Sequence, residues 1–241
     1  MTPMPENISA RPGEPPALPD YLRQTYSWAY ATPQAVRRFE RQWLVNLILW
    51  GNLARLRDAA LACFGGPPGD RLPGRSLQIA CVYGDLTARF AALHQREEQL
   101  DVIDVLPIQL ANLRRKLGPA SRVGLRLADS ADLPMPTASY ERALLFFLLH
   151  EQPLAVRVQT LRQAFRVVKP GGKIVLVDYH RPGRLHPLYG VMALVFKTLE
   201  PYALDLWRTP LDTWWPADMP PAQVTRRTCF GGLYQVVEVI R

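Results

Sequence analysis

From residue 76 onward, short apolar runs alternate with amphipathic segments along the chain. The apolar runs have the length of buried β-strands, and we expect strands at 77–82, 100–105, 123–127, 143–149 and 173–178. The intervening segments have helical periodicity, and we expect helices at 88–93, 108–117 and 156–168. Lys169-Pro170-Gly171-Gly172 is expected to end the last helix. Strands that alternate with helices predict right-handed crossovers and a parallel sheet.

The end of the chain breaks this alternation. Two β-rich runs, 224–230 and 233–240, are joined by Gly231-Gly232, which is typical of a hairpin. A mostly parallel sheet that finishes with an antiparallel hairpin differs from the dehydrogenase form of the doubly wound fold. We therefore predict an α/β, Rossmann-like fold of the class I methyltransferase type, with a seven-stranded sheet and an N-terminal helical cap.

The first seventy residues are expected to precede this sheet. Residues 1–17 are rich in proline and lack an apolar core, which is typical of a disordered leader rather than a signal peptide. Residues 18–70 show helical patterns that end in proline and glycine. We therefore divide the chain into a leader at 1–17, a helical cap on the substrate side at 18–70, and a methyltransferase-like catalytic domain at 71–241.

The 241 residues carry a formal net charge of +8. This charge fits an anionic partner, either a nucleic acid or a membrane surface, and it fits an arginine-rich coding bias equally well. The aromatic residues are not interleaved with a basic stripe, which argues against nucleic acid. No apolar run reaches the roughly 20 residues that span a bilayer. The three cysteines have no paired spacing, so we expect reduced thiols in a cytoplasmic protein.

Three places at the carboxyl ends of the expected strands can contact an adenosine-containing cofactor. The first is the turn after the first strand, where a glycine-rich sequence is usual but only Gly84 remains. The second place is Asp104, at the end of the second expected strand, and the third is Asp129, at the end of the third. Each aspartate can accept hydrogen bonds from the cofactor or cap a helix. The predicted cofactor-binding residues are Gln78, Ala80, Val82, Tyr83, Gly84, Asp104, Val105, Asp129 and Ser130.

Titratable residues gather after the fourth and fifth expected strands. His150 follows one strand, Asp178, Tyr179 and His180 end the other, and His186 lies six residues further on. Such residues at strand ends can supply acid–base chemistry or donate to a developing oxyanion. We predict His150, Asp178, Tyr179 and His180 as catalytic residues. Asp178, His180 and His186 can also ligate a divalent metal, although each alone is explained by capping or loop hydrogen bonds.

The segment 186–207 has a dense apolar face. One interpretation is a core helix that covers the sheet, and the other is a lid for an apolar substrate that touches a bilayer.

Seven strings of the sequence match a family pattern. They are Leu18-Pro19-Asp20-Tyr21-Leu22, Thr25-Tyr26-Ser27-Trp28-Ala29-Tyr30, Ile48-Leu49-Trp50-Gly51-Asn52, Ala80-Cys81-Val82-Tyr83-Gly84-Asp85, Phe146-Phe147-Leu148-Leu149-His150-Glu151, Val177-Asp178-Tyr179-His180 and Thr228-Cys229-Phe230-Gly231-Gly232-Leu233-Tyr234-Gln235. With these strings the chain resembles the RquA family of rhodoquinone biosynthesis proteins from about residue 18 to its end and, more distantly, the methyltransferases of ubiquinone and menaquinone biosynthesis.

This resemblance implies the conversion of ubiquinone to rhodoquinone, in which an amino group replaces a ring methoxy group. It implies S-adenosylmethionine as the amino donor and a divalent metal, manganese, as a further cofactor. It also implies a peripheral location on the inner face of the membrane that holds the quinone. We hypothesise that Ala80 and Val82, which stand where glycines are usual, redirect the cofactor from methyl transfer to nitrogen transfer. His180 or His150 is the expected base, and Tyr179, a histidine or a metal on Asp178 is expected to polarise the quinone carbonyl.

Two other functions stay open at this point. One is a conventional S-adenosylmethionine-dependent methyltransferase that acts on a quinone or another lipophilic acceptor. The other is a catalytically inactive protein of the same fold that binds lipid or serves as a scaffold, which the missing glycines favour and the cluster of His and Asp opposes.

Overall fold

The computed structural model describes residues 19–25, 33–65 and 71–241. The expected leader at 1–17 and the string 26–30 lie outside these residues. Seven strands form one sheet in the order β3-β2-β1-β4-β5-β7-β6. The strands are β1 (Ser76–Ile79), β2 (Leu100–Asp104), β3 (Gly124–Leu127), β4 (Tyr140–Phe146), β5 (Val168–Tyr179), β6 (Gln223–Cys229) and β7 (Tyr234–Ile240).

Strands β1 to β5 pair in parallel, whereas β7 pairs antiparallel with both β5 and β6. The predicted mostly parallel sheet with a C-terminal antiparallel hairpin is therefore confirmed. The hairpin turns at Gly231 and Gly232, which both have positive φ. Each end of β6 and β7 lies within one residue of the predicted run. The alternation of inward and outward side chains specifies the register of such strands strongly.

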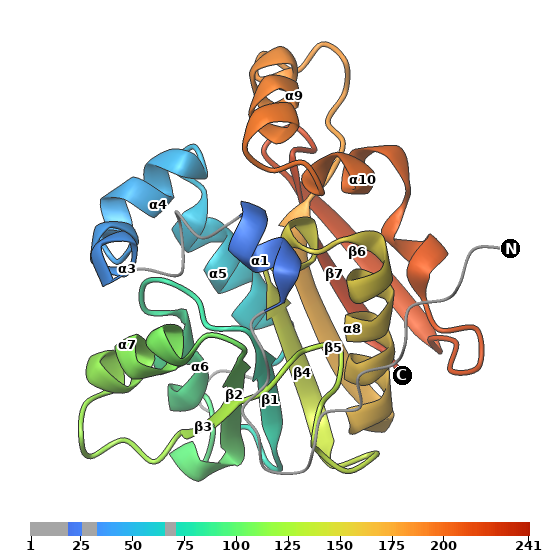
Figure 1. The fold of residues 1–241 in the computed structure, drawn as a ribbon. Coiled ribbons are helices and arrows are strands. Elements are labelled where there is room, and N and C mark those ends of the chain that lie inside the picture. Colours follow the sequence, from blue (N-terminus) through green and yellow to red (C-terminus); the bar gives the residue numbers. More distant parts are fainter. Residues whose placement is uncertain (1–18, 26–32, 66–70) are drawn as a thin grey trace, which may run out of the picture.

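Helices cover both faces of the sheet, as Figure 1 shows. Four of them, all before the first strand, are α1 (Asp20–Thr25), α3 (Pro33–Phe39), α4 (Gln42–Ile48) and α5 (Leu53–Ala62). The others are α6 (Leu86–Ala92), α7 (Pro107–Leu117), α8 (Leu154–Val167), α9 (Tyr189–Thr198) and α10 (Ala203–Arg208), with short 3-10 turns η1 (Glu97–Gln99), η2 (Leu149–Glu151) and η3 (Leu211–Trp214). Within the described residues, none of these helices is both long and apolar enough to cross a membrane.

The core lies between the central strands and the helices on either side. Every residue of β1 and β2 is buried, and so are the last four of β4. Strands covered on both faces can be apolar throughout, which explains why these segments read as continuous apolar runs rather than alternating ones.

Several boundaries differ from the predicted ones. β1 ends at Ile79 rather than at residue 82, and β4 spans Tyr140–Phe146 rather than 143–149. Lys169-Pro170-Gly171-Gly172 does not form a separate turn, because β5 begins at Val168 and includes these residues. The strand accommodates them by a shift in register between Tyr140 and Arg142 of β4 and by a positive φ at Gly171. The segment 186–207 forms two helices, α9 and α10, instead of one.

The strands end abruptly where the cavity described below begins. β1 stops at Ile79, and Ala80 has a φ of 76°; β4 stops at Phe146, and Phe147 has a φ of 53°. Both residues are in the left-handed region, which side chains with a Cβ rarely adopt. The chain therefore turns sharply at the carboxyl end of each of these two neighbouring strands.

Candidate functional site

A cavity of about 500 Å³ opens at the carboxyl ends of β1, β2 and β4. This volume lies in the usual range for small-molecule sites. One side, the turn wall, consists of residues 80–83, 103–106 and 128–130, and the other, the histidine wall, consists of His150, Glu151, Tyr179 and Glu200. Side chains of α1, α4 and α9 complete the cavity at its mouth.

Gln78 supports the turn wall from behind. Its side chain is fully buried, its Nε2 donates to Ala80 O at 2.9 Å, and its Oε1 accepts from Thr87 Oγ1 at 3.0 Å. It is not among the residues that line the cavity. The structure therefore gives Gln78 a positioning role for the turn and for α6, and not the direct cofactor contact that we predicted.

Ala80 takes the backbone conformation that a glycine would supply at no steric cost. Its φ of 76° is unfavourable for a residue with a Cβ by about 1–2 kcal/mol. Hydrogen bonds from Ala80 N to Ile103 O at 3.0 Å and from Gln78 to Ala80 O hold it there. The absent glycine therefore leaves the left-handed turn in place and adds a methyl group to the cavity wall.

Asp104 ties the turn to the end of β2. Its Oδ2 accepts from Cys81 N at 2.8 Å and its Oδ1 accepts from Leu106 N at 2.8 Å. Burial raises the pKa of this carboxyl to about 6, against the lowering effect of these backbone hydrogen bonds. Leu106 precedes the first residue of α7, so its hydrogen bond to Asp104 closes a turn and does not cap the helix. Asp104 also lines the cavity, and its contact with the cofactor stays a prediction.

The loop after β3 brings Asp129 and Ser130 to the same wall. Asp129 Oδ1 accepts from Ala131 N at 2.8 Å, which closes a tight turn. Ser130 Oγ lies 2.9 Å from Thr160 Oγ1 and accepts from Gln152 Nε2 at 3.0 Å. Ser130 therefore connects the turn wall to the segment that carries His150.

An ion pair fastens Glu40, which directly follows α3, to the turn wall. Lys116 Nζ lies 2.7 Å from Glu40 Oε1 and donates to Val82 O at 3.1 Å. Glu40 also accepts from Asn112 Nδ2 at 2.6 Å. Predicted residues Val82, Tyr83 and Val105 line the cavity, whereas Gly84 does not and lies near Glu40.

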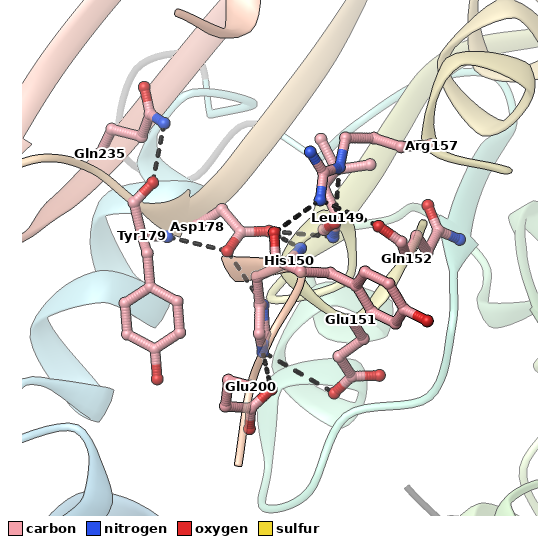
Figure 2. A network of polar contacts seen from close by, with 10 residues as sticks. Leu149, His150, Glu151, Gln152, Arg157, Asp178, Tyr179, Glu200 and Gln235 are labelled. Carbon is pink, nitrogen blue, oxygen red and sulfur yellow. Dashed lines mark hydrogen bonds and ion pairs between the residues drawn. The ribbon is translucent and has the colours of Figure 1, made fainter. Parts of the chain in front are cut away.

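On the histidine wall, Asp178 orients His150 (Figure 2). His150 Nδ1 lies 2.9 Å from Asp178 Oδ1, and both side chains are almost completely buried. Asp178 also accepts from the backbone N–H groups of Leu149 at 2.9 Å, His150 at 3.2 Å and Tyr179 at 2.8 Å. Four donors thus hold the carboxylate, so Asp178 is a positioning residue that lies behind His150.

The other nitrogen of His150 points between two carboxylates of the cavity. His150 Nε2 lies 3.9 Å from Glu151 Oε1 and 3.8 Å from Glu200 Oε2. Burial alone would lower the pKa of His150, but Asp178, Glu200 and Glu151 prevail and raise it to about 9. A raised pKa favours the protonated imidazole, so His150 is suited to donate a proton, whereas we predicted it, with His180, as a candidate base.

Tyr179 lies beside His150 in the same wall. Their ring centroids are 4.9 Å apart in an edge-on arrangement, and Tyr179 also packs against Phe196 of α9 at 4.7 Å. Burial raises the pKa of Tyr179 well above its ordinary value. The phenol therefore stays protonated and can donate a hydrogen bond to a ligand in the cavity.

His180 and His186 face the hairpin and not the cavity. His180 Nδ1 lies 2.8 Å from Gly232 O, and His186 Nε2 lies 3.1 Å from Phe230 O. Neither lines the cavity. The structure thus does not bring together the predicted metal ligands Asp178, His180 and His186, and the described residues contain no group of three His, Cys, Asp or Glu side chains suited to a metal.

Two residues that the sequence did not single out surround His150: Glu200 lines the histidine wall, and Arg157 supports η2 from outside the cavity lining. Glu200 comes from the loop between α9 and α10, fifty residues beyond His150. Arg157, fully buried in α8, donates to Leu149 O at 2.8 Å and to Gln152 O at 2.9 Å, so it fixes both ends of η2 (Figure 2). The signal for Arg157 in the sequence was a single charged residue on the buried face of α8, which is otherwise uncharged.

Residues 77–172 match the family model described as a methyltransferase domain. The chain is 30% identical over 162 residues to the ubiquinone/menaquinone biosynthesis C-methyltransferase UbiE of Ectopseudomonas mendocina, with 65% of this chain and 61% of that protein covered. It is 32% identical over 143 residues to UbiE of Teredinibacter turnerae, with 58% and 55% covered. The matches therefore span less than two thirds of the length of these relatives.

Solved structures give the same indication about the fold. Phosphoethanolamine N-methyltransferase 2 of Haemonchus contortus, in complex with S-adenosyl-L-methionine, matches 92% of this chain and 59% of its own with a TM-score of 0.65 and 12% identity. The chain has the class I methyltransferase fold. The N-methyltransferase NodS of Bradyrhizobium japonicum WM9, in complex with S-adenosyl-L-homocysteine, matches 86% of this chain and 96% of its own with a TM-score of 0.54 and 14% identity.

Within this methyltransferase fold, the turn wall lies at the switch point between β1 and β4, where the strand order reverses. Open α/β sheets bind their ligands at such a point. The histidine wall follows β4 and β5 and faces the same cavity. One continuous cavity therefore joins the expected cofactor position to the titratable side chains.

Proposed function

We propose that this protein is an S-adenosylmethionine-dependent enzyme that transfers a group to a quinone. The observation that carries the proposal is the single cavity that joins Asp104 and Asp129 to the buried His150–Asp178 pair. Relatives named for ubiquinone and menaquinone biosynthesis support a quinone as the acceptor.

The residues of the turn wall fit the cofactor. Asp104 keeps acceptor capacity beyond its two backbone hydrogen bonds, since a carboxylate offers about four lone-pair sites. It stands at the end of β2, where the ribose hydroxyls are bound in this kind of fold. Asp129, Val82, Tyr83 and Val105 also line the cavity. In this proposal Asp129 accepts a hydrogen bond from the adenine amino group, and the other three side chains supply apolar contact.

Of the transfers that this cavity can support, we propose the amination of ubiquinone to rhodoquinone. When bound, the cofactor supplies the transferred group, which is the amino nitrogen in amination and the sulfonium methyl in methylation. Two observations support amination: the residues that resemble the RquA family, and the methyl group that Ala80 adds to the turn.

The side chains of the histidine wall have complementary tasks in this proposal. Protonated His150 donates a hydrogen bond to a quinone carbonyl oxygen, which makes the ring carbon more electrophilic. Glu151 or Glu200 accepts the proton that the attacking amine loses, and His150 protonates the methoxy oxygen, which leaves as methanol. The same carboxylate then removes the proton from the cofactor carbon that bears the nitrogen, the quinone ring takes up the two electrons, and water completes cleavage of that carbon–nitrogen bond, which leaves the amino group on the reduced ring. Asp178 keeps the imidazole oriented throughout, and Tyr179 donates a second hydrogen bond to the substrate.

Methyl transfer is the second candidate, because the curated relatives are named C-methyltransferases. The test is to incubate the purified protein with ubiquinone and cofactor that carries a nitrogen label on the amino group in one sample and a methyl label in another. Mass spectrometry of the quinone product should find only the nitrogen label. A product that carries the methyl label instead would establish methylation.

The third function, a non-catalytic protein that binds lipid or acts as a scaffold, has a separate test. We expect calorimetry to detect binding of S-adenosylmethionine, with weaker binding by Asp104→Asn. If neither label reaches any product while the quinone still binds, the non-catalytic function replaces both enzymatic ones.

The manganese that the resemblance implies does not fit the described residues, because they hold no suitable group of three ligands. No step is therefore assigned to a metal. Activity measured after dialysis against a chelator, with and without added Mn²⁺, tests the requirement directly. We also propose that the protein meets its substrate at the inner face of the quinone-containing membrane.

A further inference from the structure

Exposed apolar side chains are concentrated on two segments of this molecule. Ten large hydrophobic side chains are exposed in the described residues, and eight of them lie within 43–50 and 185–199. The first segment contributes Trp43, Leu47, Ile48 and Trp50. The second contributes Leu185, Val191, Leu194 and Leu199. We call these eight side chains the apolar rim.

The two halves of the apolar rim lie on either side of the cavity mouth. Leu47, Ile48 and Trp50 line the cavity from the side of α4, and Leu199 lines it from the side of α9. Trp50 Nε1 lies 3.4 Å from Sδ of Met192, a buried residue of α9, so this rim side chain contacts the helix that carries Val191 and Leu194. Figure 1 shows α4 and α9 at the same end of the molecule, beyond the carboxyl ends of the central strands.

The exposed charges within the two rim segments have a single sign. Residues 41–53 and 181–199 include Arg41, Arg181, Arg184 and Lys197, all exposed, but no aspartate or glutamate. Two glutamates flank these ranges: Glu40 is engaged by Lys116, and Glu200, whose side chain is 18% exposed, lines the cavity 3.8 Å from His150 Nε2. An apolar surface whose exposed charges are cations is complementary to a bilayer whose headgroups are anionic.

We propose that the apolar rim is a docking surface for an anionic phospholipid bilayer, on which the cavity mouth opens toward the acyl chains. Exposed apolar patches of this kind mark interaction sites, and tryptophan and leucine beside arginine and lysine are typical of interfacial membrane contact. Entry of the quinone directly from the bilayer rests on the proposed function, whereas bilayer binding itself does not.

The test uses the full chain with phosphatidylcholine vesicles, alone or mixed equally with phosphatidylglycerol. Trp43→Glu and Leu194→Glu alter rim side chains that are 62% and 63% exposed and do not line the cavity. Leu154→Glu is the matched control, because Leu154 is 50% exposed on α8, outside the rim. Circular dichroism verifies that all three variants are folded.

We expect the wild-type protein and Leu154→Glu to sediment with the anionic vesicles, more weakly at high salt. Each rim variant should lose binding by at least about tenfold. Equal loss in Leu154→Glu, or no binding of the wild type to anionic vesicles, overturns the proposal. So does a dimer of the wild type in analytical ultracentrifugation that the rim variants convert to a monomer, since the rim is then an interface between two copies.

Activity assays separate this proposal from the proposed function. On a short-chain, water-soluble quinone without vesicles, the rim variants should turn over as fast as the wild type. On a long-chain quinone in anionic vesicles they should be at least about tenfold slower. Vesicle binding without turnover of either quinone supports the docking surface and contradicts the proposed enzymatic function. Turnover without vesicle binding supports the enzymatic function and contradicts the docking surface.

Discussion

On the turn wall of the cavity, side chains hold the backbone in place, whereas on the histidine wall the backbone holds side chains in place. Asp104 accepts from the N–H groups of Cys81 and Leu106, and so fixes the loops around it. The N–H groups of Leu149, His150 and Tyr179 instead fix Asp178, which orients His150.

This difference separates the two walls electrostatically. The turn wall has a buried carboxyl whose pKa is raised to about 6, and the histidine wall has an imidazole whose pKa is raised to about 9. Between these two values both groups are charged, with opposite signs, in one cavity. Cofactor binding and catalysis should therefore respond to different mutations, and to pH changes near 6 and near 9 respectively.

The largest expected effect is on the histidine wall. His150→Gln removes the group that holds the proton, and we expect kcat to fall by about 10²–10⁴-fold. The Kd of S-adenosylmethionine, measured by calorimetry, should change little because the turn wall is intact. A variant that lost cofactor affinity as much as turnover would show that the two walls are not separate.

Asp178→Asn tests the orientation of His150. The amide cannot hold the imidazolium as a carboxylate does, so the pKa of His150 should fall and kcat should decrease by about 10²-fold. The pH profile of kcat should lose its decline near pH 9 and decline at a lower pH instead. A lower kcat with an unshifted profile would mean that Asp178 acts only on the fold.

On the turn wall, Asp104→Asn should weaken S-adenosylmethionine binding by roughly tenfold or more, since a hydrogen bond to a charged acceptor is lost. In the wild type the carboxyl is protonated below its pKa of about 6, so affinity should fall as the pH decreases through that value. The variant should show a flat dependence over the same range. Calorimetry at several pH values measures both, and equal slopes would exclude Asp104 as the contact.

His150 also links stability to pH. Its pKa is raised above the ordinary value of 6.5, so its stabilising effect is complete below about pH 6.5 and is lost as the pH rises through 9. The free energy of unfolding should therefore decrease over this interval by something on the order of 3 kcal/mol. Urea denaturation of the wild type and of His150→Gln measures it, and the variant should lack this decrease.

The smallest effect concerns Ala80. Replacing it by glycine relieves the left-handed strain, and we expect stability to increase by about 1 kcal/mol. If the methyl group directs the cofactor, amination should nevertheless slow down. Ala138→Gly is the matched control, because Ala138 also has a positive φ but does not line the cavity. It should stabilise the protein without altering the product, and equal effects on activity would count against a role for the Ala80 methyl.

The positions of the strands along the chain were predictable because runs of apolar residues report burial directly. The segment 143–149 illustrates the limit, because its apolar run continues past the end of β4. Leu148 and Leu149 are buried where η2 begins rather than by strand pairing, and the half-buried Phe147 lines the cavity. Pro170-Gly171-Gly172 was predicted to lie in a turn after the helix, but these residues belong to β5. A strand with an irregular register accommodates the same residues that normally end a helix.

The site was predictable only where it lies at strand ends. Asp104, Asp129, His150 and Tyr179 line the cavity because the carboxyl ends of parallel strands converge. His180 follows β5 just as closely, but the hairpin draws it to Gly232 O. Glu200 comes from a loop with no local pattern, and only the packing of α9 and α10 brings it to His150.

The ion pair between Glu40 and Lys116 has a consequence for protein engineering. It joins a helix that precedes the sheet to the loop that receives the cofactor, through Val82 O. A chimera that takes residues 33–65 into another protein of this fold would need a lysine and an asparagine at the equivalents of 116 and 112. The helices before the sheet and the turn after β1 are therefore exchangeable only as a matched set.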